Sequence, residues 1–340
     1  MPRLSNMLKD IKRNDLNKLS KNELLEIRKE VLKEFKTNSH QNKKLQLEKF
    51  QNPRSEDLVK ILRDVEEVIY GVDDRKESYE VTDPKIKANI NSTVCLIRKS
   101  DLIDNGNGTS TIKTRKFGTS RNLCNEEKFY DQPIAPFCSG FLVANDMITT
   151  AAHCVDNSQD LEGIRFIFGY KMKNPNEAHT IIDNSEIYEG QSIVKRVLDG
   201  NGSDWAIIKL KNSVSGDHKP VVLQKQGKIA DNESVYVIGH PVGLPMKFAD
   251  GANVKINDSK SFFVCNLDTY GGNSGSPVFN SLTHEVEGIL VRGETDFIMQ
   301  NGCYKSKVCP QNPVDPNPDN PANVCRGEDC TRTSEFLDYV

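Results

Sequence analysis

Short runs of β-branched and aromatic residues, separated by Gly, Asn and Asp, fill the chain after residue 67 and constrain its fold more than any other feature. No helical pattern alternates with these runs. Many short strands joined by turns favour a barrel or a sandwich. The clearest runs are 68–70, 92–97, 140–143, 165–168, 206–210, 235–238 and 286–291. The sequence therefore predicts a mainly β domain over residues 67–309.

The two ends of the chain differ from this middle part. Apolar residues in 1–66 recur at helical spacing, which predicts a helical extension. Residues 1–60 hold 15 Lys and Arg against 9 Asp and Glu, a net charge of +6. Such a basic arm is suited to docking a regulatory protein partner, to acting as a pro-segment, or to packing as a solvated helical hairpin. Residues 310–340 begin with a Pro/Asn-rich run and are predicted to form a loop and a C-terminal tail.

Charge and hydropathy exclude two classes of partner. The formal net charge of the whole chain is −3, which does not indicate a nucleic-acid binder. No apolar run approaches the roughly 18 residues that a membrane span needs. The first ten residues are interrupted by charges and contain no apolar signal-peptide core, so a cytoplasmic location is expected, with secretion by a non-classical route as the alternative.

The strongest chemical motif is Gly271-Gly272-Asn273-Ser274-Gly275-Ser276-Pro277. A serine hydroxyl is a poor nucleophile and needs a base and an oxyanion site. Glycines beside it allow a tight turn that aims backbone N–H groups inward. The motif predicts Ser274 as a nucleophile, with the N–H groups of Gly272 and Ser274 forming an oxyanion hole. A simple Gly/Ser surface turn is the alternative.

Two further motifs hold a base and a carboxylate. His153 follows an apolar run that ends in small residues, in Ile148-Thr149-Thr150-Ala151-Ala152-His153-Cys154. Asp204 directly precedes the apolar run 205–210, where its carboxylate can accept a hydrogen bond from an imidazole. Taken alone, each residue is more often structural than catalytic. Together with Ser274 they occur in the chain order His, Asp, Ser, which is that of the chymotrypsin arrangement.

These three motifs closely resemble those of the trypsin-like serine peptidase family, over roughly residues 66–300. The resemblance implies two six-stranded antiparallel β-barrels of the chymotrypsin type, with the active site between them. It implies a serine endopeptidase in which His153 is the base, Asp204 orients it and Ser274 attacks the peptide bond. It also implies a disulfide between Cys138 and Cys154, and no metal or organic cofactor.

The residue before the nucleophile departs from trypsin. Trypsin has an aspartate there, which pairs with a freshly cut N-terminal amine, whereas this chain has the neutral Asn273. That charge pair cannot form, so cleavage of the N-terminal arm is not expected to be needed for pocket formation by that route. The asparagine form, and the run from Gly239 to Pro245, resemble the bacterial glutamyl-endopeptidase branch.

The predicted substrate-binding residues are Asp268, Thr269, Val291, Arg292 and Gly293. Asp268 lies six residues before the nucleophile, at the base of trypsin's primary pocket, and there it favours Arg or Lys at P1. Val291-Arg292-Gly293 stands where the family often has Ser-Trp-Gly, so a serine that supports the catalytic aspartate is missing.

Alternatives to a basic P1 preference remain open. A glutamyl-specific peptidase is one of them, although the histidine that the glutamyl branch carries on its pocket wall is replaced by Leu290. A catalytically silent binding protein on the same scaffold and an esterase with the same triad are the others. Of the nine cysteines, Cys303, Cys309, Cys325 and Cys330 are predicted to form two disulfides or stay free rather than bind zinc.

Overall fold

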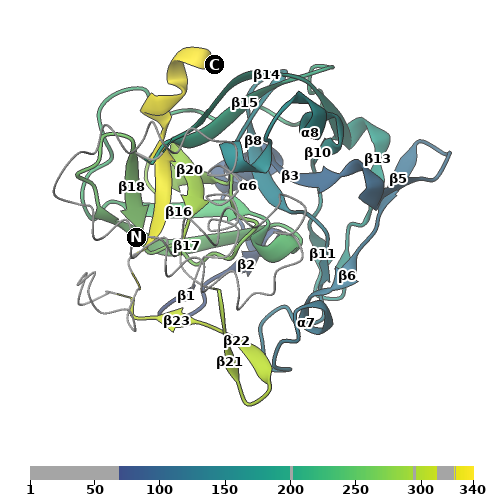
Figure 1. The fold of residues 1–340 in the computed structure, drawn as a ribbon, viewed down its shortest axis with the longest axis horizontal. Coiled ribbons are helices and arrows are strands. Elements are labelled where there is room, and N and C mark those ends of the chain that lie inside the picture. The colour runs from purple at the N-terminus through teal and green to yellow at the C-terminus, as the bar shows by residue number, and fades with distance from the viewer. Residues whose placement is uncertain (1–68, 200–201, 294–295, 312–324, 326) are drawn as a thin grey trace, which may run out of the picture. The chain divides into compact units, whose positions relative to one another are not determined.

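The computed structural model describes residues 69–199, 202–293, 296–311, 325 and 327–340. The predicted helical extension over residues 1–66 therefore lies outside the described residues. The described part is built mainly from short strands, as Figure 1 shows. No helix in it is long and apolar enough to cross a membrane.

Six antiparallel strands close the first barrel, and their burial explains why these apolar runs are strands. β3, β10 and β15 are buried along almost their whole length because one face lines the barrel and the other is covered. The ring runs through β3 (Thr93–Arg98), β8 (Cys138–Ala144), β9 (Met147–Thr150), β15 (Asp204–Leu210), β14 (Ile187–Leu198) and β10 (Ile164–Ile167), which returns to β3.

The second barrel is also a closed ring of six antiparallel strands. Its order is β16 (Ser234–Gly239), β19 (Pro277–Asn280), β20 (Val286–Arg292), β24 (Glu328–Arg332), β18 (Phe262–Cys265) and β17 (Lys247–Ile256), and β17 pairs back with β16. A short strand, β2 (Lys76–Glu77), adds to the free side of β17. The prediction of two six-stranded barrels is confirmed.

The predicted boundary at residues 309 and 310 is wrong. Strand β24 comes after it, is buried along its whole length and pairs with both β18 and β20. The second barrel would be open without this strand. Two short 3-10 helices follow, Thr333–Glu335 and Leu337–Tyr339, and they bring Phe336 and Tyr339 against Trp205 of β15.

The remaining elements surround the barrels. Helix α6 (Pro84–Asn91) begins where Asp83 accepts hydrogen bonds from the N–H groups of Lys85 and Ile86. The other α-helices and strands of the described residues are α7 (Phe117–Ser120), α8 (Ser158–Glu162), β1 (Ile69–Tyr70), β4 (Leu102–Asp104), β5 (Thr109–Ile112), β6 (Arg115–Lys116), β7 (Pro133–Ile134), β11 (Met172–Asn174), β12 (Glu177–Ala178), β13 (Ile181–Asp183), β21 (Phe297–Gln300), β22 (Cys303–Ser306) and β23 (Val308–Cys309). The hairpin β21–β22 extends away from the barrels at the lower edge of Figure 1.

Three disulfides cross-link the described residues. Cys138 pairs with Cys154, as the family resemblance implied. Cys124 pairs with Cys303 across 179 residues, and Cys309 pairs with Cys325. The other cysteines, at positions 95, 265 and 330, are free and buried.

Candidate active site

The register of the first barrel brings His153 and Asp204 together. His153 lies in the short turn Ala152–Cys154 that follows β9, and Asp204 is the first residue of β15, the neighbour of β9 in the sheet. The imidazole Nδ1 is 2.8 Å from Asp204 Oδ2, and the backbone N–H of His153 donates to Oδ1 at 3.2 Å. Both side chains are buried.

This pairing fixes the state of the imidazole. An ionised carboxylate can only accept hydrogen bonds, so the proton of the neutral imidazole lies on Nδ1 of His153. The other ring nitrogen, Nε2, then carries a lone pair and can act as a base. The guanidinium of Arg196 holds the turn from behind, because its Nε donates to the carbonyl groups of Ala152 and Val155 at 3.0 and 2.9 Å.

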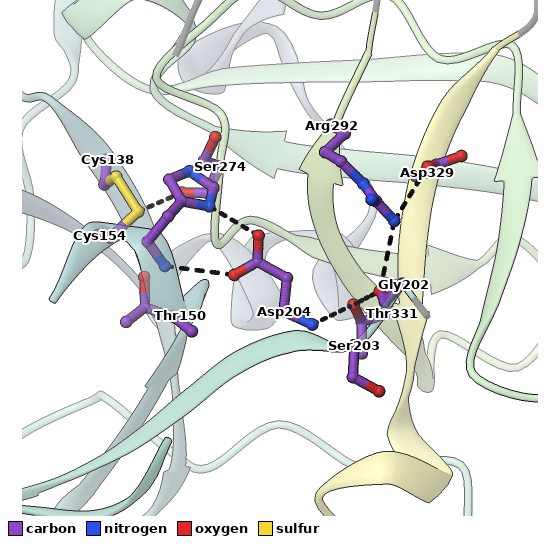
Figure 2. A network of polar contacts seen from close by, with 12 residues as sticks. Cys138, Thr150, Cys154, Gly202, Ser203, Asp204, Ser274, Arg292, Asp329 and Thr331 are labelled. Carbon is purple, nitrogen blue, oxygen red and sulfur yellow. Dashed lines mark hydrogen bonds and ion pairs between the residues drawn. A yellow bond between two sulfur atoms is a disulfide. The ribbon is translucent and has the colours of Figure 1, made fainter. Parts of the chain in front are cut away.

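Ser274 comes from the second barrel and reaches the same place. Its carbonyl oxygen accepts the N–H of Ser139 at 2.9 Å and lies 3.6 Å from Cys154 Sγ. The Sγ atoms of Cys138 and Cys154 and a ring nitrogen of His153 lie within 4.8 Å of one another. The disulfide therefore adjoins both the imidazole and the serine loop. Figure 2 shows Ser274, Asp204 and this disulfide gathered together.

The loop that carries Ser274 depends on glycine. Gly272 and Gly275 have φ angles of +100° and +89°, which L side chains rarely adopt. A Cβ at Gly275 would lie only 2.1 Å from the carbonyl oxygen of Ser139. No hydrogen bond within the described residues involves the N–H of Gly272 or of Ser274. These two donors, predicted to form the oxyanion hole, are therefore open to a ligand.

The strand of Asp204 is supported from the C-terminal strand. The backbone N–H of Asp204 donates to Thr331 Oγ1 at 3.3 Å, and that hydroxyl donates to the carbonyl of Gly202 at 3.3 Å. Figure 2 shows Thr331 beside these residues. Val291, at the position where the family often has serine, is fully buried and has no hydroxyl to offer.

Asp268 has a partner that the sequence did not indicate. Its two carboxylate oxygens accept the backbone N–H groups of Tyr70 and Asp74, at 2.7 and 2.9 Å. Burial, as the largest cause, raises the pKa of this carboxyl group above its usual value. The carboxylate thus anchors residues 70–74 of its own chain. Thr269, the next residue, has a fully buried hydroxyl with no hydrogen-bond partner among the described residues.

The predicted substrate-binding residues 291–293, called the substrate strand below, lie at the end of β20 beside two carboxylates of β24. The guanidinium of Arg292 is 3.1 Å from Asp329 and donates to the carbonyl of Gly202 at 3.4 Å. Glu328 is fully buried, and a side chain added at Gly293 would collide with its carboxylate. Sequence reasoning missed Glu328 and Asp329, because they were assigned to a C-terminal tail.

Other supporting residues were also missed or left undefined. The carboxylate of Asp296 accepts the N–H of Gly271 at 3.2 Å. The buried guanidinium of Arg75 lies 3.9 Å from the centre of the Tyr270 ring and pairs with Asp73 at 2.6 Å. No local sequence signal could have identified Arg75, since its aromatic partner is almost 200 residues away.

Two closed antiparallel barrels, with a His–Asp pair from one and a glycine-flanked serine from the other, define the chymotrypsin-like class of fold. Residues 138–289 match the family of trypsin-like peptidase domains, and this range includes His153, Asp204 and Ser274. Over residues 138–289 the chain is therefore similar to trypsin-like peptidase domains.

One curated relative and two solved structures illustrate the similarity. The glutamyl endopeptidase of Staphylococcus aureus (strain MRSA252) is 31% identical over 160 residues, which cover 44% of this chain and 41% of that protein. A Glu endopeptidase structure in complex with MPD has a TM-score of 0.44 and 17% identity, covering 80% of this chain and 97% of that one. The VesB protease of Vibrio cholerae has a TM-score of 0.44 and 16% identity, covering 79% and 66%.

Proposed function

We propose that this protein is a serine endopeptidase that hydrolyses peptide bonds through an acyl-enzyme. The observation that carries the proposal is the buried His153–Asp204 pair, adjacent to a serine loop whose Gly272 and Ser274 N–H groups have no partner among the described residues. Its substrates are proteins or peptides, and the chemistry requires no metal or organic cofactor.

The reaction divides between the same residues in two halves. Ser274 Oγ attacks the scissile carbonyl carbon while His153 Nε2 takes the hydroxyl proton. The carbonyl oxygen becomes an oxyanion and accepts the N–H groups of Gly272 and Ser274. The tetrahedral intermediate collapses, the C–N bond breaks, and His153 donates its proton to the leaving amine. Water then repeats the sequence on the acyl-enzyme and releases Ser274. Asp204 stabilises the imidazolium that forms twice in each cycle.

We propose Arg or Lys as the preferred P1 residue. Asp268, six residues before Ser274 in the sequence, supplies one negative charge. The buried carboxylate of Glu328 supplies another and lies against Gly293 of the substrate strand. The unpartnered hydroxyl of Thr269 is a further group that a P1 side chain could engage. The anchoring of Tyr70 and Asp74 competes for the oxygens of Asp268, so its contribution is the charge rather than an unoccupied acceptor.

Glutamyl specificity is the alternative. It is favoured by the similarity to the staphylococcal glutamyl endopeptidase and by the cationic Arg292 on the substrate strand. Against it stand Leu290, which offers no imidazole, and the two carboxylates close to the strand and the loop. Asp329 also neutralises Arg292 at 3.1 Å.

Kinetics on matched peptides that differ only at P1 test this preference. We expect kcat/KM for Arg and Lys to exceed that for Glu by at least tenfold. Asp268→Asn should lower the Arg-to-Glu ratio, and the ratio is the proper readout because this substitution also disturbs the anchoring of residues 70–74. Equal or faster cleavage after Glu would overturn the basic preference, while Ser274→Ala should abolish all cleavage.

The N-terminal arm is the remaining part of the proposal. We propose that it docks a regulatory partner, and that its removal is not needed to form the pocket through an amine–carboxylate pair, because Asn273 is neutral. Equal activity of the full chain and of protein trimmed within residues 1–67 would agree with the second point. Activity that appears only after trimming would contradict it.

A further inference from the structure

Ser139, the second residue of β8, contacts the nucleophile loop on both sides of Asn273. It is fully buried. Its hydroxyl donates to the carbonyl oxygen of Gly272 at 3.1 Å, and its backbone N–H donates to that of Ser274 at 2.9 Å. The same hydroxyl accepts the backbone N–H of His240 at 2.9 Å. A single residue of the first barrel therefore holds two carbonyl groups of a loop that belongs to the second.

Peptide planarity turns these contacts into control of the oxyanion hole. In a trans peptide the C=O and N–H groups point in opposite directions, so fixing one fixes the other. The carbonyl of Gly271 accepts the N–H of Val242 at 2.5 Å, which sets the direction of the Gly272 N–H. The carbonyl of Asn273 accepts the N–H of Ser276 at 2.8 Å, and this hydrogen bond sets the direction of the Ser274 N–H.

The peptide between these two is the one that Ser139 holds. Its carbonyl belongs to Gly272 and accepts the Ser139 hydroxyl, while its N–H belongs to Asn273 and donates to the carbonyl of Tyr270 at 3.1 Å. Each plane that orients an oxyanion donor is thus fixed by hydrogen bonds, and the two donors themselves stay open. The hydrogen bonds of the central plane also restrict ψ of Gly272 and φ of Asn273, the two backbone angles that connect it to the neighbouring planes.

The turn behind the loop adds a second support. Val242 has a φ of 48°, a left-handed conformation that a β-branched residue rarely adopts. The N–H of Leu244 donates to the carbonyl of Pro241 at 2.8 Å, and the Val242 side chain is buried in an apolar cluster with Tyr270 and Phe297. This conformation aims the Val242 N–H at the carbonyl of Gly271. Backbone strain of this kind clusters at functional sites.

We propose that Ser139 is a positioning residue for the oxyanion hole, acting through the carbonyl of Gly272 while the turn 240–244 acts through that of Gly271. The inference rests on the proposed serine endopeptidase function. Neutral Asn273 cannot make the charged pair that orders this loop in trypsin-like enzymes activated by a new N-terminus. Neutral hydrogen bonds from Ser139 and Val242 order the loop here, before substrate binds.

Ser139→Ala tests the proposal in the full-length protein. Losing one oxyanion donor typically costs 10²–10³ in kcat, so partial misorientation should lower kcat by about 10- to 100-fold. KM should change less than threefold, because the hole binds the transition state more strongly than the substrate. The affinity for a peptide aldehyde, whose hemiacetal oxygen occupies the hole, should fall by the same factor as kcat.

Thr149→Val is the matched control, since Thr149 of β9 is an equally buried hydroxyl without a hydrogen-bond partner among the described residues. It should leave kcat unchanged. A folded Ser139→Ala protein with wild-type kcat would overturn the proposal, as would an effect confined to KM or an equal loss in Thr149→Val.

A second experiment covers the case in which Ser139→Ala does not fold. Replacing the Val242 amide with an ester removes its N–H donor and weakens the carbonyl of Pro241 as an acceptor, while every side chain is kept. About a tenfold loss of kcat is expected. Unchanged kcat would overturn the proposal. Failure of the wild-type protein to cleave any peptide would instead refute the endopeptidase function, so the two failures can be told apart.

Discussion

Asp74 makes the stability of this domain depend on pH near neutrality. Its half-buried carboxyl group faces the carboxylates of Asp268, Asp250 and Asp73, while Arg75 is turned toward Asp73 and Lys76 toward Asp250. Burial, followed by the charges of Asp268 and Asp250, raises the pKa of Asp74 from 3.8 to about 7. Between about pH 4 and 7, the folded protein therefore keeps a proton on Asp74 that the unfolded chain has already released.

The sign follows from this difference in proton binding. The stability that the raised pKa provides is fully present below about pH 4 and is lost as the pH rises through about 7. Each tenfold change in proton affinity is worth about 1.4 kcal/mol, which sets an upper limit of about 4 kcal/mol. Solvent screening at a half-buried site reduces this to about 1–2 kcal/mol. For a domain of this size we expect a change in Tm of about 2–8 °C.

Asp74→Asn removes the titrating group and keeps the backbone N–H that Asp268 accepts. Its Tm should exceed that of the wild type by about 2–8 °C at pH 8 and by less than half of that at pH 5. Thermal unfolding followed by circular dichroism measures both values. Asp338→Asn, at an exposed aspartate near the C-terminus, should show no such dependence. An equal gap at the two pH values, or a less stable variant at pH 8, would refute the reasoning.

Three further predictions follow from the site and its cross-links. Asp204→Asn should lower kcat about 10⁴-fold with KM nearly unchanged, because an amide can donate to Nδ1 and so favours the wrong tautomer of His153. Peptide anilide kinetics measure this, and a loss below tenfold would contradict the role of Asp204. The paired substitution Cys124→Ser and Cys303→Ser removes a cross-link between residues 179 positions apart. It should lower the free energy of unfolding by up to about 5 kcal/mol, measured as a lower denaturant midpoint. An unchanged midpoint would speak against that disulfide. Alkylation of unfolded, non-reduced protein should modify Cys95, Cys265 and Cys330 alone, and mass spectrometry finding more labelled sites would refute the disulfide assignment.

The strands with strong β composition were predictable because their signal is local. The runs around residues 92–97, 206–210 and 286–291 all became barrel strands. The pairing of Cys138 with Cys154 followed from the family resemblance. The motif around Ser274 required glycines at two positions that the structure finds in left-handed conformations, so local backbone chemistry marked this loop in advance.

Strands without that local signal escaped prediction. β14 (Ile187–Leu198) is twelve residues long, but polar residues on its exposed side weaken the apolar pattern. β24 begins with Glu328 and Asp329 after a run rich in proline and asparagine, which obscured it. Both strands are specified by their partners in a closed barrel rather than by their own composition.

The supports of the nucleophile loop could not be predicted for the same reason. The partners of Asp268, at positions 70 and 74, lie almost 200 residues away in the sequence. Ser139 reads in the sequence as an ordinary strand residue next to a cysteine. Only the assembled barrels reveal that its hydroxyl lies within 3.1 Å of the carbonyl oxygen of Gly272.

Labelling with a peptide phosphonate tests the nucleophile most directly. An activated Ser274 should displace the leaving group and form one covalent bond, which intact-protein and peptide mass spectrometry would locate at residue 274 with one adduct per chain. The Ser274→Ala protein should take up none. Absence of labelling in the folded wild-type protein, or an adduct that persists in Ser274→Ala, would contradict the account.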